Sequence, residues 1–206
     1  LPLLMLLVMW VLMWIQWYFS LSFYFLGVHP LHFNGLQGII TGIFIHGNWG
    51  HLLGNSVPFF MLTSALYYYY PKVSNKVFIG LWLTSGLYLW LFARGNWHIG
   101  ASGLVYSLAF FHVVSAVIQR EIRLMAFSML IIFLYGSMIW GFFPEFFPNE
   151  NISWQAHAMG AVVGIIFAIY FRKDAPKPKQ YFPDESDDMD DYDDELPYWM
   201  KQDDSH

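Results

Sequence analysis

Long apolar stretches dominate this chain and set the first limit on its fold. A helix needs about 20 mostly apolar residues to cross the roughly 30 Å hydrocarbon core of a bilayer. Six stretches have or approach that length, and polar or breaker-rich segments separate them. We expect transmembrane helices over residues 3–25, 51–70, 77–93, 102–118, 124–142 and 155–171. The chain is therefore predicted to be an all-α membrane protein built as a bundle of six transmembrane helices.

The charge distribution supports this prediction and separates a tail from the apolar body. Only 12% of the 206 residues are charged, about half of what a soluble domain carries. Of the 15 acidic residues, all but Glu121, Glu145 and Glu150 lie after residue 173. We expect a membrane domain over residues 1–172 and a disordered acidic tail over residues 173–206, because so polar a segment cannot bury a core.

The first apolar stretch reads as a retained helix. It has no basic segment before it and no small-residue cleavage site after it, so a signal peptide is not indicated.

The sequence also contains no cysteine, which excludes disulfides, zinc–thiolate sites and a cysteine nucleophile.

Basic residues indicate the orientation of the predicted helices. If there are six spans, every connecting segment that carries several basic residues falls on one side of the membrane, and only Arg94 falls on the other. By the positive-inside rule that side is cytoplasmic. We therefore expect both termini in the cytoplasm and the protein in the plasma membrane. The basic residues on the cytoplasmic side are Lys72, Lys76, Arg120, Arg123, Arg172, Lys173, Lys177 and Lys179.

Three polar residues lie at a common depth in the predicted spans. Asn55, Ser102 and His157 precede the first basic residue after their spans by 17, 18 and 15 residues. At about 1.5 Å per residue these intervals become about 25, 27 and 22 Å, which agree within one helical turn. Polar groups inside a span are costly and are candidates for function. The shared depth predicts one water-accessible site that opens toward the extracytoplasmic side.

The residue types at this depth favour nucleophilic catalysis. A serine hydroxyl needs a neighbouring base to remove its proton, and a neutral histidine tolerates burial while exchanging protons near pH 7. No Asp or Glu lies in any predicted span, so we predict a dyad of Ser102 and His157 without a carboxylate. Tyr106, one helical turn after Ser102, is the candidate to orient the imidazole by aromatic packing.

Small residues around these two positions favour a close approach of their helices. Gly100 and Gly103 flank Ser102, and Gly160 and Gly164 follow His157 on a stripe of small residues spaced by four. If these faces meet, His157 lies beside Ser102.

Acyl transfer also needs hydrogen-bond donors for the developing oxyanion. The backbone N–H of Ser102 at a helix N-terminus is one such donor. His51 and Asn55 share a helical face and can supply side-chain donors. His46 lies in the preceding segment, where we expect it to brace the loop.

These motifs resemble those of the rhomboid family of intramembrane serine proteases. The resemblance covers residues 1–172 and rests on three motifs in the order of the family: His46…His51…Asn55, Gly100-Ala101-Ser102-Gly103 and Ala156-His157-Ala158-Met159-Gly160.

The resemblance implies an endopeptidase that cleaves transmembrane segments of membrane-protein substrates. Ser102 would be the nucleophile and His157 the general base, with Tyr106 stacked on it. His51, Asn55 and the Ser102 backbone would form the oxyanion hole, and predicted span 5 with residues 142–154 would form a mobile gate and cap. The chain departs from many relatives in one respect. No arginine precedes Arg94, so the Trp-Arg pair of their first loop is missing and the bracing of that loop is unexplained.

The main alternative is a catalytically inactive relative that binds membrane clients. Such a protein is expected to lack the serine or the histidine, and both are present here. A metalloprotease would need an H-E-x-x-H motif, which the sequence lacks. We expect no metal, no cofactor and no nucleic-acid partner, and we assign His98 and His112 to structural roles.

Overall fold

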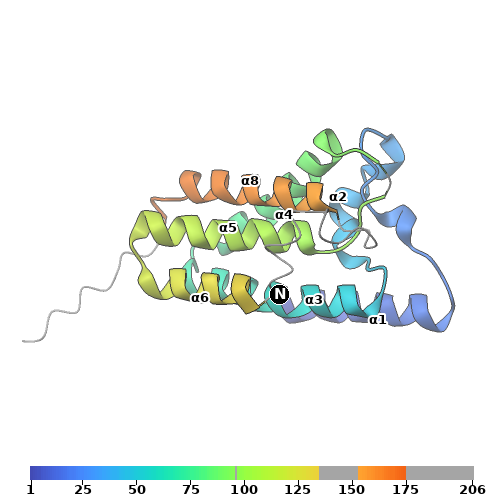
Figure 1. The fold of residues 1–206 in the computed structure, drawn as a ribbon, viewed down its shortest axis with the longest axis horizontal. Coiled ribbons are helices and arrows are strands. Elements are labelled where there is room, and N and C mark those ends of the chain that lie inside the picture. Colours follow the sequence, from blue (N-terminus) through green and yellow to red (C-terminus); the bar gives the residue numbers. More distant parts are fainter. Residues whose placement is uncertain (96, 135–152, 175–206) are drawn as a thin grey trace, which may run out of the picture.

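Helices make up the regular structure of the chain in this computed structural model, which describes residues 1–95, 97–134 and 153–174 (Figure 1). Within these ranges the one β-type pairing is an isolated bridge between Val28 and His98. The predicted all-α fold is confirmed for this part of the chain. The long helices are α1 (Pro2–Tyr18), α3 (Trp49–Tyr69), α4 (Ser74–Phe92), α5 (Ser102–Gln119), α6 (Ile122–Leu134) and α8 (Trp154–Tyr170).

The segment between α1 and α3 folds into short helical turns. They are η1 (Tyr24–Leu26), η2 (Phe33–Gly35), α2 (Gly38–Thr41) and η3 (Gly42–Phe44). We refer to residues 19–48 as the first loop.

One helix in the described ranges is both long and apolar enough to cross a membrane, and it is α5. Three further apolar helices are shorter, namely α1, residues Ile122–Phe133 and α8. The count of six spans therefore stays a prediction. Residues 135–142 of the expected fifth span and the acidic tail from residue 175 lie outside the described ranges.

The first apolar stretch ends earlier as a helix than its composition predicts. We expected a helix to residue 25, whereas α1 ends at Tyr18 and the chain turns at Ser20, which has a φ of +52°. Gln16 fixes this turn, because its Oε1 accepts a hydrogen bond from the Phe23 N–H at 3.2 Å. The apolar residues after Tyr18 continue into the first loop instead of the helix.

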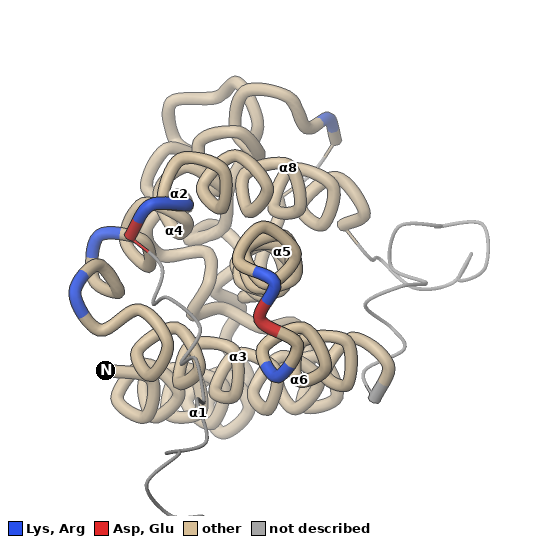
Figure 2. The backbone as a smooth tube through the Cα atoms, turned by 90° about the vertical axis from the view of Figure 1, so that its left-hand side faces the viewer, with Lys and Arg blue, Asp and Glu red and all other residues tan. Residues whose placement is uncertain are grey.

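Helix α5 lies at the centre of the bundle. Figure 2 shows it in end view with α8, α4, α3 and α6 arranged around it. Ten of its 18 residues are buried, including Ser107 and His112. Ser107 Oγ donates to the Gly103 carbonyl at 2.8 Å, and His112 Nε2 lies 2.9 Å from the Leu62 carbonyl oxygen. His112 Nδ1 has no hydrogen-bond partner among the described residues.

Most basic residues gather at one end of this bundle. Figure 2 looks onto that end, where Lys and Arg residues mark the turns between α3 and α4 and between α5 and α6, and the end of α8. The acidic residues of the described ranges, Glu121 and Asp174, lie at the same end. Ser102 is at the opposite end of α5, away from every described carboxylate.

Candidate active site

Ser102 begins α5 directly after a turn that requires glycine. Gly100 has a φ of +103°, in the left-handed region that favours glycine. A Cβ at this position would also lie 2.6 Å from Nε2 and Cε1 of His51. The Gly100 N–H donates to the Gly42 carbonyl at 2.9 Å, which ties the turn to the first loop. Ser102 is thereby held at the N-terminus of α5, where backbone N–H groups have no acceptor within the helix.

His51 and Asn55 face this turn from the first two turns of α3. The position of a Cβ on Gly100 is 2.6 Å from the His51 ring and 3.5 Å from Asn55 Nδ2. Asn48 caps α3 by accepting the His51 N–H at 2.8 Å, which fixes the start of the helix. Asn55 is only 6% exposed, and its Nδ2 has no hydrogen-bond partner among the described residues. Seven other buried side-chain atoms of the described residues also lack a partner. Asn55 Nδ2 differs from a general packing defect by its place, because it faces the turn that presents Ser102.

Helices α5 and α8 meet backbone to backbone through glycine. A Cβ at Gly160 would lie 2.1 Å from the Gly103 carbonyl oxygen, and one at Gly103 would lie 3.3 Å from the Ala156 carbonyl oxygen. Gly103 follows Ser102 and Ala156 precedes His157 in the chain. The direct neighbours of the two candidate dyad residues are therefore in contact across the helix pair.

We expect the Gly160→Ala substitution to destabilise this helix pair. The added methyl group would overlap a backbone oxygen, and overpacking of this kind costs about 1–3 kcal/mol. Unfolding of the detergent-solubilised protein by heat or by SDS measures the loss.

Gly54→Ala is the matched control for that experiment. Gly54 also lies inside a helix, but a Cβ there would meet nothing within 4 Å. Alanine is favoured over glycine in helices by about 0.5–1 kcal/mol, so this variant should be at least as stable as wild type. Equal stability of Gly160→Ala and wild type would refute the tight α5–α8 contact.

His157 lies in the first turn of α8 and is held by an aromatic stack. Its ring centroid is 4.1 Å from that of Tyr106, and the two rings are within 9° of parallel. Both residues are buried, with exposures of 6% for His157 and 2% for Tyr106. Tyr106 lies one turn after Ser102 on α5, so the ring that packs on His157 belongs to the helix that carries Ser102. The stack restricts the imidazole to one plane.

His46 lies behind His51, at the end of the first loop. Its ring meets that of His51 edge to face, with centroids 5.0 Å apart, and its side chain is 2% exposed. Burial, and secondarily the proximity of His51, lowers the pKa of His46 to about 3. His46 is therefore neutral at physiological pH, and its contacts suit a bracing role.

Gln16 is a site-supporting residue that the sequence analysis missed. Its Nε2 donates to the His46 carbonyl at 3.3 Å, and the side chain is 8% exposed. A signal was available, because Gln16 is the one amide side chain in the first apolar stretch, and such a residue in a span is a functional candidate.

The first loop is braced without the Trp-Arg pair of many relatives. Thr41 Oγ1 donates to the Leu26 carbonyl at 2.6 Å, and Gln37 Nε2 donates to the Phe25 carbonyl at 2.8 Å. Trp97 stacks on His29 at a centroid distance of 4.6 Å, which joins the loop to the segment before α5. These contacts supply the bracing that the sequence left unexplained.

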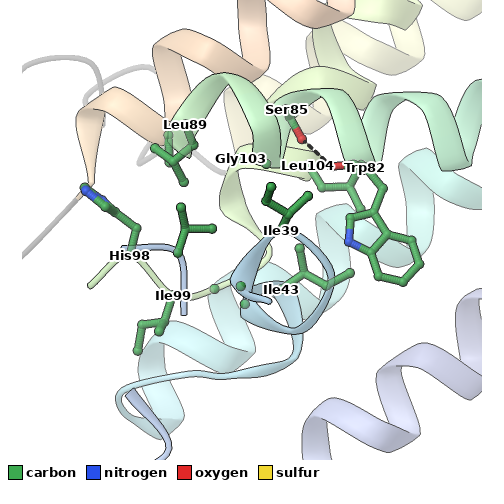
Figure 3. A pocket seen from close by; sticks show the side chains of 15 residues that line it. Ile39, Ile43, Trp82, Ser85, Leu89, His98, Ile99, Gly103 and Leu104 are labelled. Carbon is green, nitrogen blue, oxygen red and sulfur yellow. Dashed lines mark hydrogen bonds between the residues drawn. The ribbon is translucent and has the colours of Figure 1, made fainter. Parts of the chain in front are cut away.

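An apolar pocket lies behind the Gly100 turn. Figure 3 shows Ile39 and Ile43 of the first loop, Trp82 and Leu89 of α4, and Ile99 around it. Gly100 and Gly103 line the pocket, whereas Ser102 and His157 do not. The pocket therefore lies between the first loop, α4 and the start of α5, and it is separate from the candidate dyad.

The predicted cap, residues 142–152, falls outside the described ranges. Within those ranges, no three His, Asp or Glu side chains gather closely enough to hold a metal ion.

Comparison with known proteins places this arrangement in a family. The Rhomboid domain matches residues 33–174 of the chain. An uncharacterised protein of Mycobacterium tuberculosis is 31% identical over 154 residues, which are 69% of this chain and 62% of that protein. An uncharacterised protein of Mycobacterium leprae is 29% identical over 153 residues, 69% of this chain and 59% of that protein. Rhomboid-related protein 1 of Caenorhabditis elegans is 30% identical over 136 residues, 61% of this chain and 37% of that protein. The chain spans less than two thirds of the length of these relatives. With its domain match covering more than half of its residues, the chain belongs to the rhomboid family of integral membrane proteins.

Proposed function

We propose that this chain is an intramembrane serine endopeptidase that cleaves transmembrane segments of other membrane proteins. Ser102 is the nucleophile and His157 the general base. The observation that carries the proposal is the convergence of three helices on one turn. Helix α8 contacts α5 next to Ser102 and His157, while His51 and Asn55 of α3 face Gly100 from another side.

The reaction begins with attack of Ser102 Oγ on the scissile carbonyl carbon while His157 takes the hydroxyl proton. The negative charge that develops on the carbonyl oxygen is stabilised by the Ser102 N–H, by His51 and by Asn55 Nδ2. When the C–N bond breaks, His157 returns the proton to the leaving amine. Water, activated by the same imidazole, then hydrolyses the acyl-enzyme and restores Ser102.

The arrangement also supports a dyad that works without a carboxylate. A third group in such sites normally orients the base, but the described acidic residues lie at the other end of the bundle. Tyr106 takes over the orienting role by stacking, and the Gly103–Gly160 contact fixes the separation of the two helices.

The catalytic residues also favour an enzyme over a relative that only binds membrane clients. An unsatisfied buried donor costs about 1–3 kcal/mol, and one beside the turn that presents Ser102 suits an oxyanion site. Asn55 Nδ2 is such a group within the described residues.

Membrane topology forms part of the proposal. We place a catalytic domain of six spans over residues 1–172 and a cytoplasmic acidic tail over residues 173–206. The basic end of the bundle then faces the cytoplasm, and the site opens to the extracytoplasmic side of the plasma membrane. A reporter inserted in residues 144–153 should be extracytoplasmic and one placed after Lys179 cytoplasmic. The reverse pattern would contradict this orientation.

The proposal is tested by reconstituting the full-length protein in liposomes with a single-span membrane protein as substrate. Wild type should produce two substrate fragments, and Ser102→Ala should produce none. Absence of fragments with wild type across several single-span substrates, in protein that also fails to react with a fluorophosphonate, would refute the protease assignment.

A further inference from the structure

His98 joins three parts of the molecule that are distant in the sequence. It lies in the segment between α4 and α5, four residues before Ser102. Its backbone pairs with Val28 of the first loop through two hydrogen bonds of 2.8 Å. Its Nδ1 lies 2.6 Å from Ser153 Oγ, 55 residues later in the chain. In Figure 3 the His98 side chain extends from the pocket wall toward the start of α8.

Ser153 is the N-cap of the helix that carries His157. Its Oγ accepts the Ala156 N–H at 3.3 Å, and its carbonyl accepts the His157 N–H at 3.3 Å. In the tautomer with the ring proton on Nε2, the Ser153 hydroxyl donates to His98 Nδ1 while its oxygen accepts from Ala156. One serine thus links the His98 ring to the first turn of α8.

A second contact ties the same two segments together. Gln155 Nε2 donates to the Arg94 carbonyl at 3.3 Å. The segment before α5 therefore holds the first turn of α8 at two points. Of these, the His98–Ser153 contact is the shorter and the better shielded from solvent.

We propose that His98 is a positioning residue for the candidate dyad. Through Ser153 it sets the place of the first turn of α8, and hence of His157, relative to the turn that presents Ser102. This inference rests on the proposed function. A serine at position 153 could cap α8 without His98. The contact with His98 additionally fixes the start of α8 relative to the start of α5.

Loss of this register is expected to slow the reaction at Ser102 strongly, although only one side chain is changed. A misplacement of reacting groups by about 1 Å can slow a reaction by about 100-fold. We therefore expect His98→Phe, which keeps a ring but cannot bond Ser153, to lower the maximal rate constant of inactivation by a fluorophosphonate about 10- to 100-fold. The concentration for half-maximal rate should change little, because the substitution removes a hydrogen bond between His98 and Ser153 within the protein and leaves Ser102, His51 and Asn55 in place.

A double-mutant cycle separates positioning from general destabilisation. Ser153→Ala should slow the reaction by a similar factor, and the His98→Phe/Ser153→Ala double variant should be no slower than the worse single variant. His98→Asn should recover most of the rate, because its amide places a polar atom near the position of Nδ1. His32→Phe is the matched control. It replaces an exposed loop histidine that stacks on His29 and whose Nδ1 contacts the Pro30 carbonyl. The phenyl ring keeps the stack, so this variant should react like wild type.

Hydrogen exchange of the Ala156 and His157 amides tests the same link without catalysis. Both amides should exchange faster in His98→Phe than in wild type and be restored in His98→Asn. Additive effects in the cycle, or a slow His98→Asn variant with unchanged exchange, would overturn the inference. If wild type itself does not react with the fluorophosphonate, the proposed function fails, and the exchange rates alone decide whether His98 holds α8.

Discussion

Replacing Ser102 with alanine is expected to abolish reaction with a fluorophosphonate and cleavage of a membrane substrate. Replacing His157 with alanine should lower both by at least about 1,000-fold, because a serine hydroxyl without its base is a weak nucleophile. The double variant should be no slower than the slower single one, since the two residues act as a unit. Gel detection of a fluorescent probe and time courses of cleavage in liposomes measure these effects.

Two variants serve as matched controls. Ser115→Ala removes another buried serine of α5, at 4% exposure and more than three turns from Ser102. His32→Phe replaces a histidine of the first loop outside the candidate site, and it keeps an aromatic ring to stack on His29. Both should label and cleave as wild type does. Labelling that survives in Ser102→Ala would mean that another residue is the nucleophile. Labelling of His157→Ala at the wild-type rate would remove His157 as the base.

Loss of activity in Ser102→Ala or His157→Ala must be distinguished from loss of packing. His157 packs face to face on Tyr106, so a loss of rate could in principle arise from repacking of α8. Thermal unfolding of each variant distinguishes the cases. A variant that unfolds like wild type and does not react identifies chemistry, and not packing, as the cause.

Much of the fold follows from the lengths of apolar stretches in the sequence. The starts of α5 and α8 agree with the predicted ones to within one residue, because a mostly apolar run begins at Ser102 and at Trp154 after a segment that contains polar residues. The end of α1 was predicted seven residues too late, since apolar loop residues such as Phe23 and Phe25 are indistinguishable in composition from helix residues. Only the hydrogen bond from Phe23 N–H to Gln16 identifies them as loop.

The candidate site could be predicted where helical periodicity brings residues together. His51 and Asn55 share a face of α3, and Tyr106 follows Ser102 by one turn of α5, so both pairs follow from spacing. The similar predicted membrane depths of Asn55, Ser102 and His157 then indicated that α3, α5 and α8 contribute to one site. The contacts of Gln16 and His98 join residues 30 and 55 positions apart, and no local pattern reports such pairs.

Replacing Asn55 with leucine is expected to lower kcat about 100- to 1,000-fold, which is the usual cost of one oxyanion donor. KM should stay nearly unchanged, because the donor acts on charge that develops only in the transition state. The same substitution should leave thermal stability equal or higher. Asn55 Nδ2 is buried without a hydrogen-bond partner among the described residues, and an apolar side chain of similar size removes that penalty.

The neighbouring residue provides a control with the opposite expectation. Ser56 Oγ accepts from Trp10 Nε1 at 3.0 Å and donates to the Leu52 carbonyl at 2.7 Å, so its hydrogen bonds are satisfied within the resting protein. Ser56→Ala should lower stability by about 1 kcal/mol and leave kcat near the wild-type value. The two adjacent positions of α3 thus separate a polar group kept for the transition state from one kept for the fold. A parallel loss of stability and activity in Asn55→Leu, or an unchanged kcat, would contradict the role of Asn55 as a donor to the oxyanion.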